Sequence, residues 1–371
     1  MDIDKMKTRG IINEGNLMRF AAIMKKAQNK EPLTIGFLGG SITMGALSSK
    51  PTTCYAYQVY EWWKTKFCYD DVTYINAGIG ATTSQFAIAR LNQDLLCYEP
   101  DVVFLEFSVN DEDTYKFQQT YEACVRKILS SKKQPALLML HNVLYDTGIN
   151  AQNNQNEIGL HYDLPIVSIK ESIYQEIVDG KLKESDITPD HLHPNDVGHQ
   201  LVAGVITHLL DQIYDNVKSY DSLIEYVIPK AYTKNHYENS IRYNQTNVKP
   251  WLDGFVKDEV EQKQITDVFR NGWKASKVGE KITFEVTGSM ISVQYRQSIH
   301  KPAPIAKAVV DFEEENARIL DANFTENWGD KLELQDLLVD GVFKTHTVTI
   351  TILEAKEPLA SEFYLASIIT A

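Results

Sequence analysis

The sequence predicts an α/β domain with a parallel sheet, followed by an antiparallel β-sandwich (jelly-roll-like) domain. Residues 33–217 alternate short apolar runs with longer amphipathic segments, as repeated βα units do. Residues 218–371 contain segments of strict two-residue alternation, which is the pattern of half-buried antiparallel strands. A chain of 371 residues is also long enough for two domains of ordinary size.

The first domain is expected to span residues 1–217. An amphipathic helix that carries Leu17, Phe20, Ala21 and Met24 should precede the first strand. The predicted strands are 33–38, 72–76, 102–107, 136–141 and 165–169. The predicted helices are 55–67, 83–96, 115–129 and 196 to about 213. In the last of these, apolar residues recur every four positions and indicate one buried helix face, namely Val197, Leu201, Val205 and Leu209.

The second domain is expected to span residues 218–371. Its alternation is clearest where Ile282, Phe284 and Val286 are separated by polar residues, and a β-sandwich is the architecture that such strands build. This domain also contains Trp251, Trp273 and Trp328. Their faces could stack on sugar rings, and burial in the core is the alternative because tryptophan buries a large apolar area.

Composition restricts the class of partner. A formal net charge of -13 argues against nucleic acid, since phosphate binding needs clustered Lys and Arg. No run of about 18 apolar residues predicts a membrane span. No apolar signal-peptide segment follows residues 1–9, and the four cysteines (Cys54, Cys68, Cys97 and Cys124) lack the close spacing of a metal or redox motif. A cytoplasmic protein with reduced thiols is expected, and the sequence gives no indication of its oligomeric state.

The first predicted strand runs directly into Gly39-Gly40-Ser41. This places a serine at the carboxyl end of a central strand, where open α/β sheets bind ligands. Glycines at that point let the backbone turn sharply beside a substrate. The alternative is an ordinary turn between a strand and a helix, because Gly-Gly-Ser is common there.

A possible partner for this serine lies at the end of the first domain, in the segment Asp190-His191-Leu192-His193-Pro194-Asn195. A serine hydroxyl needs a base to accept its proton and a third group to fix the tautomer of that base. His193 and Asp190 could fill these two roles. One alternative is a turn in which Asn195 caps the following helix.

A second alternative is a metal site, because His191, His193 and His199 lie close to Asp190 in the sequence. Their spacing matches no zinc signature. Neither a metal nor a cofactor is therefore expected.

Two further turns follow predicted parallel strands and should reach the same edge of the sheet as Ser41. One contains Gly80 and Ala81, and the other contains Asn110. Acyl transfer needs hydrogen-bond donors for the oxygen that becomes negative. The amide of Gly80 or Ala81 and the side-chain amide of Asn110 are suitable donors. Each also has a purely structural explanation, because Gly and Asn-Asp are frequent in turns.

These four blocks, in this order, resemble those of the SGNH (GDSL-like) hydrolase family. The resemblance covers residues 31–215 and implies a flavodoxin-like three-layer αβα domain. It implies that Ser41 is the nucleophile, that Asp190 and His193 complete the triad, and that Ser41, Gly80 or Ala81, and Asn110 form the oxyanion hole. Three residues depart from the family pattern: Gly40 replaces a frequent Asp, and Ala81 and Val109 each replace a Gly.

The resemblance also implies a function. SGNH enzymes with a β-sandwich module are similar to carbohydrate O-acetyl esterases, so the expected substrate is a small-molecule or oligosaccharide O-acyl ester, with acetylated sugars preferred. A lipase or thioesterase would use the same triad, and a carbohydrate-binding protein with a vestigial triad is the alternative outside enzymes. His141 and Tyr145 follow the fourth predicted strand and could line the site or pack in the core.

Overall fold

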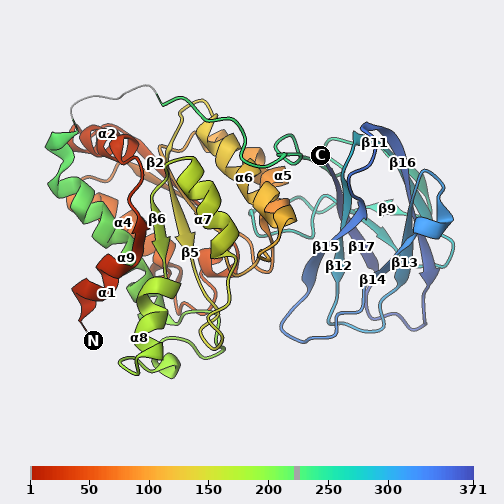
Figure 1. Ribbon diagram of the computed structural model, residues 1–371. Helices are drawn as coiled ribbons and strands as arrows, with labels where there is room; N and C mark the ends of the chain where they lie inside the picture. The colour runs from red at the N-terminus through yellow and green to blue at the C-terminus, as the bar shows by residue number, and fades with distance from the viewer. Residues whose placement is uncertain (1, 221–225) are drawn as a thin grey trace. The chain divides into compact units, whose positions relative to one another are not determined.

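The computed structural model describes residues 2–220 and 226–371. The chain divides into two compact units, Met1–Glu238 and Asn239–Ala371, and the ribbon is shown in Figure 1. The predicted order, an α/β domain followed by an antiparallel β domain, is confirmed. None of the helices within the described ranges is long and apolar enough to cross a membrane.

The first unit contains a six-stranded sheet in the order β1-β6-β5-β4-β2-β3. All neighbours from β3 to β6 pair in parallel, and only β1 is antiparallel, at the edge beside β6. The parallel strands follow the βα pattern that the sequence predicted. Their bounds are β1 (Ile11–Asn13), β2 (Leu33–Gly39), β3 (Val72–Gly78), β4 (Val102–Glu106), β5 (Ala136–His141) and β6 (Ile166–Ser168).

Helices cover both faces of this sheet, which gives the predicted three layers. The helices α1, α2, α4 and α9 lie on one face, and α5, α6 and α7 lie on the other (Figure 1). The helix bounds are α1 (Ile3–Arg9), α2 (Met18–Gln28), α3 (Ser41–Met44), α4 (Tyr55–Phe67), α5 (Ser84–Asp94), α6 (Tyr115–Leu129), α7 (Gln152–His161), α8 (Gln175–Val178) and α9 (Asp196–Asp215).

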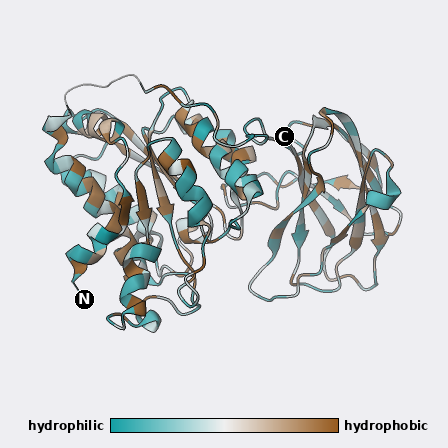
Figure 2. Ribbon diagram, viewed as in Figure 1, coloured by the Kyte–Doolittle hydropathy of each residue, from teal (hydrophilic) through white to brown (hydrophobic). Residues whose placement is uncertain are grey.

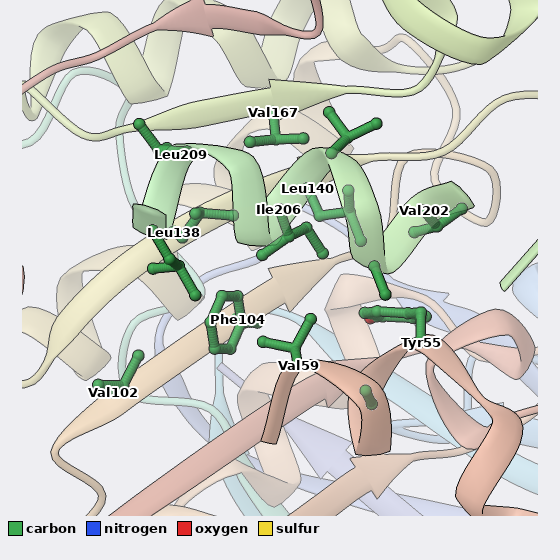
Figure 3. Packing of buried hydrophobic residues seen from close by; sticks show 14 of the residues in the cluster. Tyr55, Val59, Val102, Phe104, Leu138, Leu140, Val167, Val202, Ile206 and Leu209 are labelled. Atoms are coloured by element: carbon green, nitrogen blue, oxygen red, sulfur yellow. The ribbon is translucent and has the colours of Figure 1, made fainter. Parts of the chain in front are cut away.

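The core beneath α9 shows why the last helix is fixed on the sheet. Val202, Ile206 and Leu209 belong to the same buried cluster as Leu138 and Val167 of the strands, and Figure 3 shows this packing. All five side chains are completely buried. In Figure 2 the strands are hydrophobic, while the outer faces of the helices are hydrophilic. Burial of this apolar face holds α9, and with it the turn that precedes it, in place.

Several short elements of the first unit were not predicted. The edge strand β1 has only three residues, and α8 has only four, so neither shows a measurable period. The helix α7 has the sequence QNNQNEIGLH, in which apolar residues are too few to define a stripe.

The first unit also extends beyond the boundary predicted after residue 217. Residues 226–238 pack on α6, where the Glu122 carboxylate accepts the amide of Thr233 at 2.8 Å. Arg126 donates to the carbonyl of Pro229 at 2.8 Å and pairs with Glu238 at 3.0 Å. These contacts are made by polar groups that follow no repeating pattern in the sequence. The hydrophobic pattern therefore predicted the domain boundary too early.

The second unit is a pair of antiparallel sheets. One has the order β15-β12-β17-β10-β9 with β7 also paired to β17, and the other has the order β14-β13-β16-β11-β8. Strands of both sheets contribute to one buried cluster, as in a β-sandwich. The bounds are β7 (Ile241–Tyr243), β8 (Trp251–Asp253), β9 (Val256–Lys257), β10 (Trp273–Ala275), β11 (Lys281–Gly288), β12 (Ile291–Gln297), β13 (Ile305–Val310), β14 (Arg318–Asp321), β15 (Lys331–Leu338), β16 (Lys344–Glu354) and β17 (Phe363–Thr370).

The three tryptophans of this unit have different environments. Trp273 is completely buried and packs edge-on against Phe284, with 5.2 Å between the ring centroids, so it is a core residue. Trp251 and Trp328 are 59% and 55% exposed. Only these two remain candidates for contact with a sugar.

Candidate active site

The direction of winding of the sheet reverses at the carboxyl ends of β2 and β4. From β2 the chain first adds β3 on one side, and β4 then pairs with β2 on the other side. Gly39, the last residue of β2, is level with Gly78 and Glu106 on its two neighbours. Ligands of open α/β sheets bind where the direction of winding reverses in this way. The turns that follow β2, β3 and β4 therefore meet at one rim.

Ser41 is the first residue of α3, directly after β2. The turn is tight, since a Cβ on Gly39 would lie 2.1 Å from Thr43 Oγ1 and 2.7 Å from the carbonyl oxygen of Glu106. Only glycine lets β2 pass so close to both groups. Gly45, with a φ of 101°, ends the short helix. The sequence thus projects the Ser41 side chain at the rim while the residue itself is 9% exposed.

The second part of the site is the turn before α9. Asp190 Oδ1 accepts hydrogen bonds from the amides of Leu192 at 3.1 Å and His193 at 2.7 Å. His191, which lies between Asp190 and Leu192, has a φ of 66°, and this left-handed conformation forms the turn. Asn195 caps α9 by accepting the amide of Gly198 at 3.1 Å. Asn195 therefore caps α9, as the alternative interpretation holds. The Asp190 carboxylate has a further hydrogen-bond partner.

That partner is the imidazole of His193, whose Nδ1 lies 2.7 Å from Asp190 Oδ2. An ionised carboxylate only accepts hydrogen bonds, so Nδ1 carries the proton and Nε2 is left as an acceptor. Nε2 lies 2.7 Å from Ser41 Oγ, and the serine hydroxyl donates to it. The structure thus brings the three predicted triad residues together in the order Ser41, His193, Asp190.

Electrostatics favours the ionised form of Asp190. Partial burial alone would raise the pKa of this carboxyl. The hydrogen bonds from the His193 side chain and from the backbone amides of His193 and Leu192 outweigh burial and hold the pKa below its ordinary value. A charged Asp190 keeps the imidazole in the tautomer that accepts the serine proton.

Asn110 lies beside Ser41 because the turn after β4 packs on Gly40. Its Oδ1 is buried and has no hydrogen-bond partner among the residues that the structure describes, and a Cβ on Gly40 would lie 2.1 Å from this oxygen. The other end of the amide, Nδ2, donates to no acceptor within residues 2–220 and 226–371. Asp111, the next residue, accepts the Ser84 amide at 2.9 Å and joins this turn to the start of α5.

The turn after β3 supplies two further donors. The amides of Gly80 and Ala81 donate to no protein acceptor in the described part of the chain. A Cβ on Gly80 would lie 3.8 Å from Ser41 Cβ, so this turn borders the serine. Ala81 has a φ of 54°, a conformation that favours glycine. The family pattern that has Gly at this position therefore matches the backbone found here.

A buried polar network, which the sequence pattern hardly indicates, lies beneath Ser41. Thr43 Oγ1 is 2.7 Å from the hydroxyl of Tyr55 and donates to Glu106 at 3.4 Å. All three side chains are completely buried, and burial raises the pKa of Glu106 to about 7. The only signal was a glutamate at the end of an otherwise apolar strand.

Two residues proposed to line the site do not do so. His141 is completely buried and Tyr145 is 2% exposed. Burial lowers the pKa of His141 to about 4, so its ring is neutral. Both are packed inside the first unit because the chain after β5 continues beneath the surface, and the packing alternative is the correct one.

The three clustered histidines do not converge on one point. The ring of His191 is hydrogen-bonded to Glu184 at 2.6 Å, His193 faces Ser41 and Asp190, and His199 lies 3.1 Å from the carbonyl of Ala46. Within the described ranges, no group of three or more His, Cys, Asp or Glu is placed to hold a metal ion.

Comparison with known proteins adds independent information. Residues 37–201 match the model of the GDSL-like lipase/acylhydrolase family. The structure of a two-domain esterase (CEX) active on acetylated mannans is similar to this chain, with 51% identity, 98% of each chain covered and a TM-score of 0.95. The same esterase co-crystallised with mannopentaose matches with 51% identity, 98% of this chain and 97% of that chain covered, and a TM-score of 0.94. A search of curated proteins returned no match.

Proposed function

Because this chain belongs to the GDSL-like lipase/acylhydrolase family, we propose that it is a serine esterase that removes O-acetyl groups from manno-oligosaccharides. The single observation that carries the chemistry is the continuous hydrogen-bonded row from Ser41 Oγ through His193 to Asp190. The substrate class is supported by the similarity over nearly the whole chain to an esterase active on acetylated mannans.

The geometry supports the following reaction. Ser41 Oγ attacks the acetyl carbonyl carbon while His193 Nε2 takes the serine proton, and Asp190 stabilises the imidazolium that forms. His193 then gives the proton to the sugar hydroxyl as it leaves. Water, deprotonated by the same imidazole, hydrolyses the acetyl-serine and releases acetate. No metal or cofactor takes part in these steps.

The oxygen of the tetrahedral intermediate needs donors that are already in place. The amides of Ser41 and of Gly80 or Ala81, together with Asn110 Nδ2, are proposed for this role. Gly80 borders Ser41 and Asn110 lies against the neighbouring Gly40, and the backbone amides of Ser41, Gly80 and Ala81 donate to no backbone acceptor among the described residues. Such donors act without reorganisation during the reaction.

We assign the catalytic role to the first unit and an accessory role to the second. Trp251 and Trp328 are more than half exposed, which fits stacking on a pyranose ring. Replacement of each by Ala should weaken the binding of mannopentaose, as measured by isothermal titration calorimetry. Trp273, which is buried, does not belong to this group.

The function is tested by the release of acetate from acetylated manno-oligosaccharides. The parent protein is expected to release acetate, and folded Ser41→Ala is expected to release it more slowly by several orders of magnitude. Acetate release by Ser41→Ala equal to that of the parent would end the proposal. A parallel series of acetyl, butyryl and octanoyl esters separates an acetylesterase from a lipase, since an acetylesterase should lose activity as the chain lengthens.

A further inference from the structure

The first turn of α9 is hydrogen-bonded to residues 46–55, the segment that follows α3. Asp196, three residues after His193, accepts hydrogen bonds from the amide of Ser49 at 2.8 Å, from Ser49 Oγ at 2.5 Å and from Thr53 Oγ1 at 2.6 Å. The bonds from Ser49 and Thr53 lower the pKa of Asp196 to about 2. The carboxylate is therefore charged and saturated with donors from a segment more than 140 residues away in the sequence.

One turn further along α9, His199 makes a second connection to the same segment. Its Nδ1 accepts the amide of Tyr55 at 3.2 Å, and its Nε2 lies 3.1 Å from the carbonyl oxygen of Ala46. A carbonyl can only accept, so Nε2 carries the proton and the neutral ring satisfies both partners. The ring is completely buried. Burial lowers its pKa, with the nearby Asp196 carboxylate acting in the opposite direction.

Both partners of His199 continue directly to the helix that carries the serine. The amide of Ala46 donates to the carbonyl of Ser41 at 2.9 Å. The hydroxyl of Tyr55 lies 2.7 Å from Thr43 Oγ1, inside α3. Because α3 has only four residues, its own hydrogen bonds do not fix its position, and a helix this short depends on outside contacts.

We propose that His199, supported by Asp196, is a positioning residue that sets Ser41 Oγ at hydrogen-bond distance from His193 Nε2. The inference rests on the proposed function, because it assigns these side chains to the same triad. His193, Asp196 and His199 all lie within residues 190–199. The segment that carries the catalytic base therefore also binds the residues that follow Ser41, through the contacts of Asp196 and His199. His199 and Asp196 do not touch the substrate in this account.

The test uses three variants of the full chain. His199→Gln keeps a polar side chain but cannot place both an acceptor at Nδ1 and a donor at Nε2. Misplacement of a reacting group by about 1 Å costs about a hundredfold in rate, so kcat for acetyl ester hydrolysis should fall by about 10- to 100-fold. KM should stay within about twofold of the parent, because binding contacts are unchanged.

Two matched variants accompany it. His208→Gln makes the same substitution further along α9, where the ring contacts Thr8 and Gln212 instead, and it should keep the parental kcat. Asp196→Ala removes the hydrogen bonds to Ser49 and Thr53 at a half-buried position, and it should lower kcat as His199→Gln does. Thermal melting shows that each variant is folded at the assay temperature.

The second readout is the rate at which a fluorophosphonate labels Ser41, which reports activation of the serine. His199→Gln and Asp196→Ala should slow labelling in proportion to kcat. Parental kcat and labelling in a folded Asp196→Ala or His199→Gln would overturn the inference, as would a loss of the same size in His208→Gln. If the parent itself is not labelled at Ser41, the proposed function fails instead, so the two failures are distinguishable.

Discussion

Asn110 Oδ1 fills the space that a side chain on Gly40 would need, since a Cβ at position 40 would lie 2.1 Å from this oxygen and 2.9 Å from Asn110 Cγ. The two residues belong to the turns after β2 and β4, so their contact closes the rim of the site. A glycine next to Ser41 and an asparagine in this rotamer therefore depend on each other. The family pattern often has Asp at position 40, and that side chain cannot be accommodated here without movement of Asn110.

Gly40→Ala is expected to push the Asn110 amide away from Ser41. Loss of one oxyanion donor costs about 10²- to 10³-fold in kcat, and Gly40→Ala should approach that loss. The double variant Gly40→Ala/Asn110→Ala should be little slower than Asn110→Ala alone, because both changes remove the same donor. Steady-state kinetics on an acetyl ester measures this, and fully multiplicative effects would contradict the coupling.

Ser41→Ala should reduce activity far more than Asn110→Ala. The serine forms the covalent intermediate, whereas the asparagine contributes one of several donors. Acetate release under identical conditions gives the ranking, with melting curves to show that both variants are folded. Equal losses in the two variants would mean that the covalent step is not the one proposed.

Ala81→Gly should stabilise the protein. A non-glycine residue in the left-handed region costs about 1–2 kcal/mol, and the φ of Ala81 is 54°. Glycine adds unfolded-state entropy worth about 0.4–1 kcal/mol, so a net gain of about 0.5–1 kcal/mol is expected in urea unfolding. Ala87→Gly within α5 is the matched control and should instead lose about 1 kcal/mol or more. A loss of stability in Ala81→Gly would show that its backbone conformation is not strained.

Glu106 should make the protein less stable as the pH rises. Burial raises its pKa from 4.5 to about 7, so the folded state binds its proton more tightly than the unfolded state does. Its contribution is fully present below about pH 4.5 and is lost as the pH rises toward and through 7. A shift of this size corresponds to about 3 kcal/mol.

Glu106→Gln removes that titration while it keeps the shape of the side chain. Urea unfolding at pH 5 and pH 8 should show a smaller fall in the variant than in the parent. Asp111, whose pKa burial also raises to about 7, leaves a remaining slope of the same sign. An identical fall in the variant and the parent would contradict the assignment of a neutral Glu106.

The sequence predicted those parts of the fold that depend on periodic burial. The helices Tyr55–Phe67 and Tyr115–Leu129 have the predicted bounds, because each buries one apolar stripe against the sheet. The short β1 and the polar α7 were missed, since their positions depend on tertiary contacts. Residues 226–238 were assigned to the second domain because the contacts that hold them to α6 are hydrogen bonds without a repeating pattern.

The positions of the main site residues were also predictable from the sequence, because they follow parallel strands of one sheet. The carboxyl ends of parallel strands must share one rim, so the order of the motifs placed Ser41, Gly80 and Asn110 together. The sequence could not show how Thr43, Tyr55 and Glu106 support the serine from below, because those contacts join three elements. The spacing of His199 suggests a metal ligand, whereas its ring connects Ala46 to Tyr55.

The most direct test of the central claim is active-site labelling followed by peptide mass spectrometry. We expect a fluorophosphonate to modify the parent protein once, on Ser41, and His193→Ala to abolish the modification because Nε2 no longer accepts the serine proton. Modification at another residue, or parental labelling of Ser41 in His193→Ala, would contradict the proposed catalytic role of the Ser41–His193 pair.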